Sequence, residues 1–161
     1  MRTEVRSVKR VFRTVVTVSA LALVSIAAHA ATVHLTGDLK ASAEVPPNDS
    51  PGAGTVTATL DTKTNEFKYH VEFSGLTGPV VAAHFHGPAA AGANAKPQLP
   101  ITNPTCHLAV ERMCQITSPI DGMATLTPEQ AKELVDGKWY FNLHTSANPG
   151  GEIRGQILKS E

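Results

Sequence analysis

The clearest structural signal in the chain is one strictly alternating run, Glu66-Phe67-Lys68-Tyr69-His70-Val71-Glu72-Phe73-Ser74. Apolar side chains occupy every second position, and polar side chains fall between them. Successive side chains of a strand point to opposite faces of a sheet, so this pattern predicts a half-buried β-strand. A second alternating run at residues 54–61 precedes it, separated by the turn-forming residues 61–65. The sequence therefore predicts a β-hairpin over residues 54–74.

Further short runs continue this pattern along the chain. Strands are expected at residues 33–39, 80–87, 138–145 and 152–158, each bounded by turn-favouring residues. Residues 88–104 are rich in Pro, Ala, Gly and Asn and are expected to form a loop. One short helix is expected near residues 128–136, because Thr127 can cap it, Pro128 can begin it and Gly137 can end it. Many short strands with one helix predict an all-β antiparallel sandwich or barrel.

The first thirty residues have the three parts of a secretory signal peptide. A basic region is followed by the uncharged apolar run from Val15 to Ala28, and then by a cleavage-type motif, Ala28-His29-Ala30. An uncleaved anchor is the alternative, but the apolar run is short for a membrane span. We expect residues 1–30 to be removed and residues 31–161 to form one exported domain, periplasmic or extracellular, without stable membrane insertion.

Removal of this leader changes the charge balance. Five of the 14 Lys and Arg residues, but only one of the 14 Asp and Glu residues, lie in residues 1–30. The remaining chain therefore has a net charge of −4, although the complete sequence is neutral. Nucleic acids and anionic membranes attract basic surfaces. The sequence thus predicts that the partner is neither a nucleic acid nor an anionic membrane. A component of the cell envelope or matrix is the remaining candidate partner.

Two cysteines, Cys106 and Cys114, are the only ones in the chain. An exported protein meets an oxidising environment, and the pair is even in number and close in sequence. We therefore expect one disulfide that closes a small local loop. Two unpaired thiols are the alternative. The spacing is not that of a Cys-x-x-Cys redox motif.

Three histidines are the candidate site. His84 and His86 lie two apart on a predicted strand, so their side chains point the same way and Phe85 points the other way. In the later strand Trp139 and Phe141 share one apolar face, and His144 lies on the opposite face. All three imidazoles are therefore expected outside the core. Neutral imidazole is the commonest metal ligand, so their convergence would form a transition-metal site at the surface.

Several motifs in the same order resemble the CHRD domain family, named after chordin and common as single exported bacterial domains. They are Leu-Lys-Ala-Ser-Ala-Glu-Val-Pro-Pro at residues 39–47, Ala-Ala-His-Phe-His-Gly-Pro-Ala at 82–89, Leu-Thr-Pro-Glu-Gln at 126–130 and Asn-Leu-His-Thr-Ser-Ala-Asn-Pro-Gly-Gly-Glu-Ile-Arg-Gly-Gln at 142–156. The likeness extends from about residue 33 to residue 158. It implies an exported module and does not by itself imply an activity.

A weaker resemblance is to copper/zinc superoxide dismutase, a Greek-key barrel. His84 and His86 resemble its first pair of copper ligands, His144 resembles a further ligand, and Arg154 resembles its anion-guiding arginine. The fold this implies is a Greek-key sandwich or barrel of the superoxide-dismutase or immunoglobulin type. The bridging histidine and the zinc ligands have no clear counterpart, and His70 is only a weak extra candidate. The resemblance therefore implies one mononuclear site, with copper expected and zinc the alternative, and dismutase-like redox chemistry if the protein is an enzyme.

A metal-free interpretation stays open beside this one. The same histidines can bond loop carbonyls in a non-enzymatic interaction module of the envelope or matrix. Arg154 can pair with Glu152, steer anions or lie at the surface, and the ion pair is the plainest of the three. His70 fits an exposed strand position. The sequence contains no nucleophile-elbow, phosphate-loop or EF-hand motif, so common hydrolase chemistry is not indicated.

Overall fold

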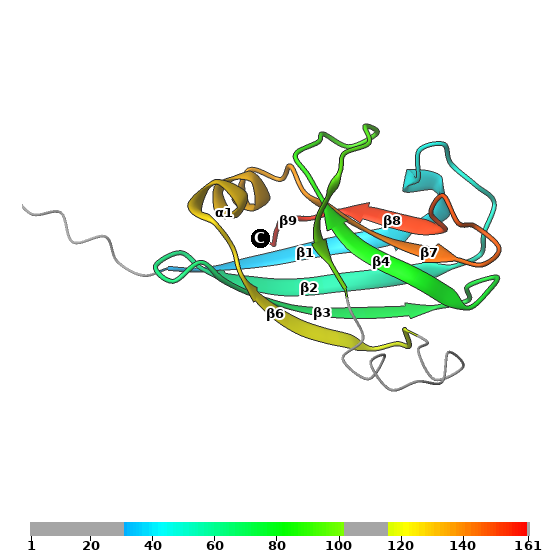
Figure 1. The fold of residues 1–161 in the computed structure, drawn as a ribbon, viewed down its shortest axis with the longest axis horizontal. Helices are drawn as coiled ribbons and strands as arrows, with labels where there is room; N and C mark the ends of the chain where they lie inside the picture. The colour runs from blue at the N-terminus through cyan, green and yellow to red at the C-terminus, as the bar shows by residue number, and fades with distance from the viewer. Residues whose placement is uncertain (1–30, 102–115, 161) are drawn as a thin grey trace, which may run out of the picture.

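The computed structural model describes residues 31–101 and 116–160, which are mostly β-strands (Figure 1). The strands are β1 Thr32–Lys40, β2 Ala53–Asp61, β3 Glu66–Ser74, β4 Val80–His86, β5 Pro97–Pro100, β6 Ile120–Thr125, β7 Tyr140–Thr145, β8 Ile153–Gln156 and β9 Leu158–Lys159. A 3-10 turn, η1 Ala41–Ala43, follows β1, and one helix, α1 Pro128–Val135, precedes β7. Within the described ranges, α1 is too short to cross a membrane.

All strands join one curled antiparallel sheet in the order β5-β4-β7-β8-β1-β2-β3-β6, with β9 also pairing with β1. The two halves of this sheet are joined narrowly, because β1 and β8 share only the register pair Lys40 and Arg154. The sheet curls into a half-barrel, so that β4 crosses over β2 and β3 in Figure 1. The predicted all-β antiparallel sandwich or barrel is confirmed.

The core lies between the two halves of the curled sheet. Phe67 of β3 and Phe85 of β4 are not on neighbouring strands, yet their ring centroids are 5.2 Å apart in an edge-to-face contact. Phe141 of β7 packs 4.8 Å from Phe85, and Trp139 borders both Phe67 and Phe85. All four rings are fully buried. Edge-to-face aromatic packing adds stabilisation beyond the burial of apolar area, so this cluster holds the halves together.

The alternating runs predicted most of these elements. The run at residues 66–74 is β3, and the predicted hairpin pairs it with β2 from Ala53–Ser74 to Leu60–Phe67. The predicted helix is also confirmed: the Thr127 hydroxyl accepts a hydrogen bond from the Gln130 N–H at 3.2 Å, and the Gln130 side chain accepts one from the Thr127 N–H at 2.9 Å. This reciprocal capping box fixes the first turn of α1.

Two strands were not predicted. β5 lies in the segment expected to be a loop, where it has proline at both ends and pairs only with β4 at the end of the sheet order. β6 contains Gly122 opposite Tyr69 of β3. A Cβ at Gly122 would lie 2.1 Å from the Tyr69 hydroxyl oxygen, so the glycine makes room for the tyrosine side chain. Both strands depend on their partners more than on their own pattern.

Candidate metal-binding site

Three histidines project from two neighbouring strands onto one face of the sheet. β4 carries His84 and His86, and Phe85 between them is fully buried on the opposite face. β7 carries His144, which lies opposite Ala82 in the antiparallel register and therefore diagonal to His84. Because adjacent side chains of a strand point to opposite faces, the burial of Phe85 fixes the direction of both neighbouring imidazoles.

The three imidazoles come close enough to share one ion. The ring centroid of His84 is 5.3 Å from that of His86 and 5.2 Å from that of His144. One ring nitrogen of each histidine lies within 4.8 Å of the other two, and within the described ranges no other group of His, Cys, Asp or Glu has this arrangement. Three points this close lie within about 2.8 Å of a common centre, and Zn–N bonds are about 2.0–2.1 Å long. Coordination of one ion would therefore require each nitrogen to move inward by about 0.7 Å.

Backbone carbonyls set the tautomers of two of the histidines. His86 Nδ1 is 2.9 Å from the Ala95 carbonyl oxygen, and His144 Nδ1 is 3.0 Å from that of Pro149. A carbonyl oxygen only accepts, so each neutral ring carries its proton on Nδ1 and leaves a lone pair on Nε2. Both Nε2 atoms, and His84 Nδ1, are buried without a hydrogen-bond partner. An imidazole that donates one N–H to a carbonyl and presents its other nitrogen is the usual form of a metal-ligating histidine.

The surroundings favour the neutral, ligating form of two rings. Burial lowers the pKa of His84, and the neighbouring His144 and His86 lower it further. Burial also lowers the pKa of His86, against the opposing effect of its hydrogen bond to Ala95. A charged imidazole would lose hydration here and would repel the adjacent rings.

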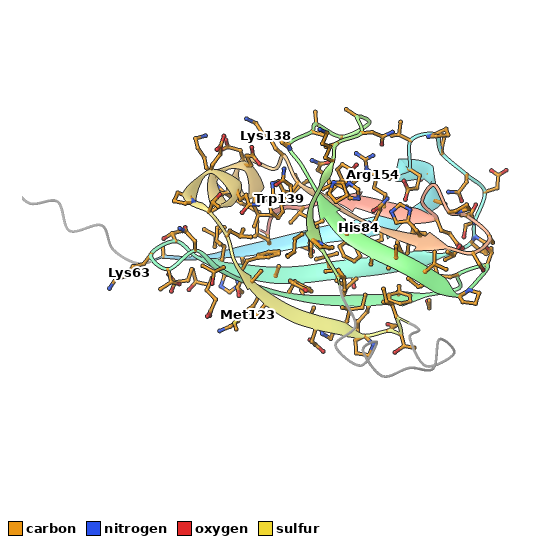
Figure 2. All side chains as sticks on the ribbon, in the orientation of Figure 1. Lys63, His84, Met123, Lys138, Trp139 and Arg154 are labelled. Atoms are coloured by element: carbon orange, nitrogen blue, oxygen red, sulfur yellow. The ribbon has the colours of Figure 1, made fainter. Side chains whose placement is uncertain are left out.

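Tyr140 and Arg154 extend the cluster across the sheet. His84 and Arg154 are labelled in Figure 2, where both lie in the region of β4, β7 and β8. The His86 ring stacks on Tyr140, with centroids 4.8 Å apart and planes 4° from parallel. The guanidinium of Arg154 lies 3.4 Å from the centre of the same tyrosine ring. β7 lies between β4 and β8, so the histidine and the arginine approach Tyr140 from its two sides, in a three-layer stack of imidazole, phenol and guanidinium.

The site is less exposed than the sequence suggested. His86 is only 8 % exposed, and Tyr140 and Asn142 on the same face are buried as well. Segments that the alternation could not place cover this face: the loop containing Ala95 bonds both His86 and the Tyr140 hydroxyl, and the turn after β7 bonds His144. The expectation of a surface cluster is corrected to a half-buried one.

Arg154 and Glu152 do not pair with each other among the described contacts. Arg154 is 2 % exposed, which rules out a surface position, and it donates to the Asn94 side-chain oxygen at 3.0 Å and to the Ala93 carbonyl at 2.6 Å. Arg154 thereby holds the loop that orients His86. The predicted ion pair between the two residues is wrong, because each has other partners. The suggested role of Arg154 in guiding anions stays a prediction.

Glu152 instead accepts hydrogen bonds from three separate segments. Its donors are the Ser50 hydroxyl at 2.6 Å, the Thr77 N–H at 2.6 Å and the Thr145 hydroxyl. Burial by itself would raise the pKa of Glu152, but these hydrogen bonds outweigh it and lower the pKa to about 2. Glu152 therefore links the turn after β7 to the loop before β2 and the turn before β4.

Two buried polar residues that were not predicted as part of the site lie beside the histidines. Glu44, directly after η1, is 5 % exposed, and Asn142, which lies opposite His84 in the register, is 4 % exposed. Burial raises the pKa of Glu44 to about 7, against the opposing effects of Arg154 and of a hydrogen bond from Asn142. Asn142 had a detectable signal, since it shares the strand face of His144, but no sequence pattern placed Glu44 nearby.

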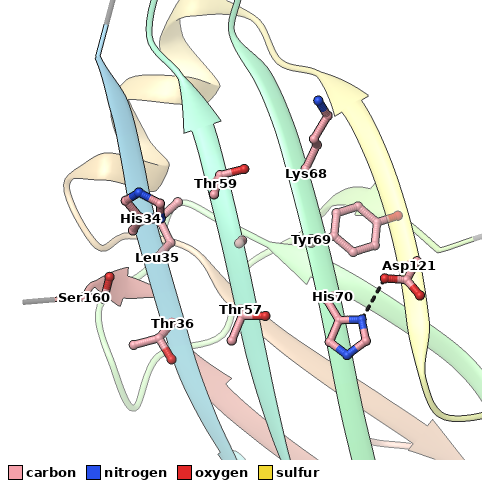
Figure 3. Close-up of a pocket in the computed structure, with 11 residues that line it drawn as sticks. His34, Leu35, Thr36, Thr57, Thr59, Lys68, Tyr69, His70, Asp121 and Ser160 are labelled. Atoms are coloured by element: carbon pink, nitrogen blue, oxygen red, sulfur yellow. Dashed lines mark hydrogen bonds and ion pairs between the residues drawn. The ribbon is translucent and has the colours of Figure 1, made fainter.

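The weak candidate His70 lies elsewhere. It stands on the outer face of β3, where its Nδ1 is 2.7 Å from Asp121 of β6 (Figure 3). A shallow depression on that face is lined by both residues and by His34, and three threonines border it. His70 therefore does not join the three clustered histidines. Cys106 and Cys114 lie outside the described residues, so the expected disulfide stays a prediction.

The comparisons with known proteins agree with the motif order. No curated protein and no solved structure matches the chain. The family model of the CHRD domain matches residues 32–157, a range that includes all three clustered histidines, Asn142, Glu44 and Arg154. The chain therefore belongs to the CHRD domain family, a typically extracellular type of module.

Proposed function

We propose that this protein is an exported CHRD module that binds one transition-metal ion through His84, His86 and His144, with copper as the first candidate. The observation that carries the proposal is the pairing of each Nδ1 of His86 and His144 with a carbonyl, while the opposite nitrogens and His84 Nδ1 stay buried and unpartnered. A buried lone pair without a donor costs free energy unless something coordinates it. A metal ion satisfies three such lone pairs at once.

The donor set favours copper and leaves zinc as the alternative. All three clustered donors are imidazole nitrogens, which suit copper, zinc and nickel, and the general order of affinities places Cu(II) highest. A site with three protein ligands keeps at least one coordination position for water or another small ligand. Bound copper would supply one-electron redox chemistry. The proposal itself stops at metal binding, because Arg154 directs its observed donors to the covering loop.

The cellular setting is part of the same proposal. The leader-like residues 1–30 would be removed on export, and residues 31–161 would act as one domain outside the cytoplasm. The mass of the exported protein tests this directly. A measured mass equal to that of residues 31–161 supports cleavage before Ala31. A mass that still includes residues 1–30 in the exported form contradicts it.

The test of the site is a Cu(II) titration of the purified protein against a competing chelator, followed by electron paramagnetic resonance. We expect one tight equivalent with a nitrogen-coordinated spectrum. His144→Gln and His84→Ala should each weaken it by about tenfold or more, since each removes one of three donors. Thermal unfolding of the metal-free variants checks that they remain folded.

The matched controls are the other described histidines. His70→Ala and His34→Ala remove imidazoles outside the cluster, so they should leave the tight equivalent unchanged. Equal losses in control and cluster variants, or the lack of any tight equivalent in the unsubstituted protein, would refute the site. Either result would favour the metal-free interaction module instead.

A further inference from the structure

Buried polar atoms without partners are concentrated in one place. Within the described ranges six buried side-chain atoms have no hydrogen-bond partner, and five of them surround the histidine cluster. Those five are His84 Nδ1, His86 Nε2, His144 Nε2, Asn142 Oδ1 and Glu44 Oε1. All five present lone pairs when the histidines are neutral and Glu44 is ionised. The set therefore has two oxygen atoms beyond the three nitrogens already assigned.

Asn142 is placed among the histidines by its strand. It lies directly opposite His84 in the pairing of β4 with β7, and His144 follows two residues later on the same face. Its side chain is 4 % exposed, so solvent does not satisfy the unpartnered oxygen. Its amide is adjacent to His86 on one side and to Glu44 on the other.

These two contacts indicate how the amide is oriented. In its ionised form the Glu44 carboxylate only accepts hydrogen bonds, so it receives the amide N–H of Asn142. On the side of His86, Asn142 Oδ1 has no hydrogen-bond partner, so the oxygen is free to face the histidines. The amide nitrogen of Asn142 therefore faces Glu44, and its oxygen faces the histidines.

Glu44 is itself held in place by close packing. Its carboxylate lies against the backbone of Gly151, where an added Cβ would be 2.5 Å from Oε1. Gly151 also has a φ of +131°, which favours glycine. The turn after β7, whose Pro149 carbonyl orients His144, thus also supports Glu44. One turn fixes both the ligand and the carboxylate.

We propose that Asn142 Oδ1 is a fourth donor to the ion bound by the three histidines, and that Glu44 is a positioning residue that fixes the orientation of the Asn142 amide. This inference rests on the proposed metal site. An amide oxygen is a weak ligand of the kind found in axial positions of copper sites, so it adjusts the geometry and affinity of the site. Above its pKa of about 7, the ionised Glu44 forces one amide orientation, whereas glutamine could accept from or donate to the amide and would permit both.

The experiment is a double-variant cycle measured by Cu(II) affinity and electron paramagnetic resonance of the full exported chain. Asn142→Ala removes the oxygen, and Glu44→Gln removes the constraint on its orientation. Supporting residues around metal ligands typically contribute about 10–100-fold in affinity, so we expect losses of that size and a shifted copper spectrum in both variants. Gln156→Leu is the control, since it removes another unpartnered buried amide oxygen on a neighbouring strand and should leave the spectrum unchanged.

The decisive variant exchanges the two side-chain types. In Glu44→Gln/Asn142→Asp the glutamine can donate to one aspartate oxygen, and the other aspartate oxygen can face the ion. The charge of the pair stays the same, so the double variant should recover affinity relative to Asn142→Ala and Glu44→Gln. A merely structural pair would not restore the copper spectrum in this way.

The outcomes separate the two proposals. Tight copper binding that depends on the histidines but has the same spectrum in Asn142→Ala and Glu44→Gln overturns only the fourth donor and the positioning role. Loss of histidine dependence overturns the metal site and this inference with it. A changed spectrum in both single variants, with recovery in the exchanged pair, supports the inference.

Discussion

Substitution of Glu152 by glutamine tests most directly whether the buried Glu152 side chain is ionised and stabilises the fold through its hydrogen bonds. The change keeps the shape of the side chain but removes its charge and replaces one acceptor oxygen with a donor. The Glu152 carboxylate is fully buried and accepts hydrogen bonds from Ser50, Thr77 and Thr145. The substituted glutamine would present an N–H group to donors that need an acceptor, so the variant should be less stable at neutral pH.

The pKa of Glu152 gives the magnitude. Folding lowers it from 4.5 to about 2. Each pKa unit corresponds to about 1.4 kcal/mol, so the charged form contributes at most about 3.5 kcal/mol to the free energy of unfolding. The donor segments are loops at the surface, where solvent screens part of this, and we expect about 2 kcal/mol. A carboxyl with a lowered folded pKa stabilises above its unfolded pKa, so this contribution is fully present above about pH 5 and disappears as the pH falls toward about 2.

The assay is urea unfolding of the protein and of Glu152→Gln at several pH values from about 7 down to about 2, a range that extends from above the unfolded pKa of 4.5 to the folded pKa of about 2. The difference in unfolding free energy should be largest at neutral pH and should shrink steadily once the pH falls below the unfolded pKa of 4.5. Asp49→Asn is the control, because Asp49 is exposed in the same loop as Ser50. A difference that is independent of pH, or equal stability at neutral pH, would refute the assignment of an ionised, hydrogen-bonded Glu152.

Two further substitutions address the other half of the sheet. Gly122→Ala places a Cβ against the Tyr69 hydroxyl, so it should lower the free energy of unfolding by about 1–3 kcal/mol. Gly150→Ala is the control and should change the free energy of unfolding little, because no atom lies within 4 Å of its added Cβ. Similar effects of the two substitutions would contradict the packing of Gly122 against Tyr69. The hydrogen bond to Asp121 raises the pKa of His70, so Asp121→Asn should lower that pKa in an NMR titration, and protonated His70 should stabilise the fold at acid pH and lose this effect as the pH rises through its folded pKa. An unchanged His70 titration in the variant would rule out this pairing.

The sequence predicted the strands that have one face entirely against the core and the other face entirely outward. Residues 66–74 alternate strictly because β3 packs against the core on one side and faces outward on the other. β6 shows no such regularity, since Gly122 accommodates a tyrosine from the next strand. β5 was hidden by its two prolines, which an end strand tolerates because it bonds on one side only.

The candidate site was predicted in part for the same reason. A period of two correctly placed His84, His86 and His144 on one face and Phe85 on the other. It could not reveal what covers that face, because loops have no period. The burial of His86, the use of Arg154 to hold a loop and the position of Glu44 all depend on that cover. Local spacing reports the direction of a side chain, while its environment depends on distant parts of the chain.

The pairing of β4 with β7 also bears on how this protein folds. It joins residues 54 to 65 positions apart in the chain, from His86 with Tyr140 to Val80 with Thr145. Closing so long a loop costs entropy before any contact offsets it, and proteins dominated by such distant pairings fold in milliseconds to seconds. A peptide containing only the His84–His86 strand cannot reproduce the arrangement. The approach of His144 to His84 therefore requires this long-range pairing, and the imidazole signals of these residues in NMR should report when β4 and β7 have joined.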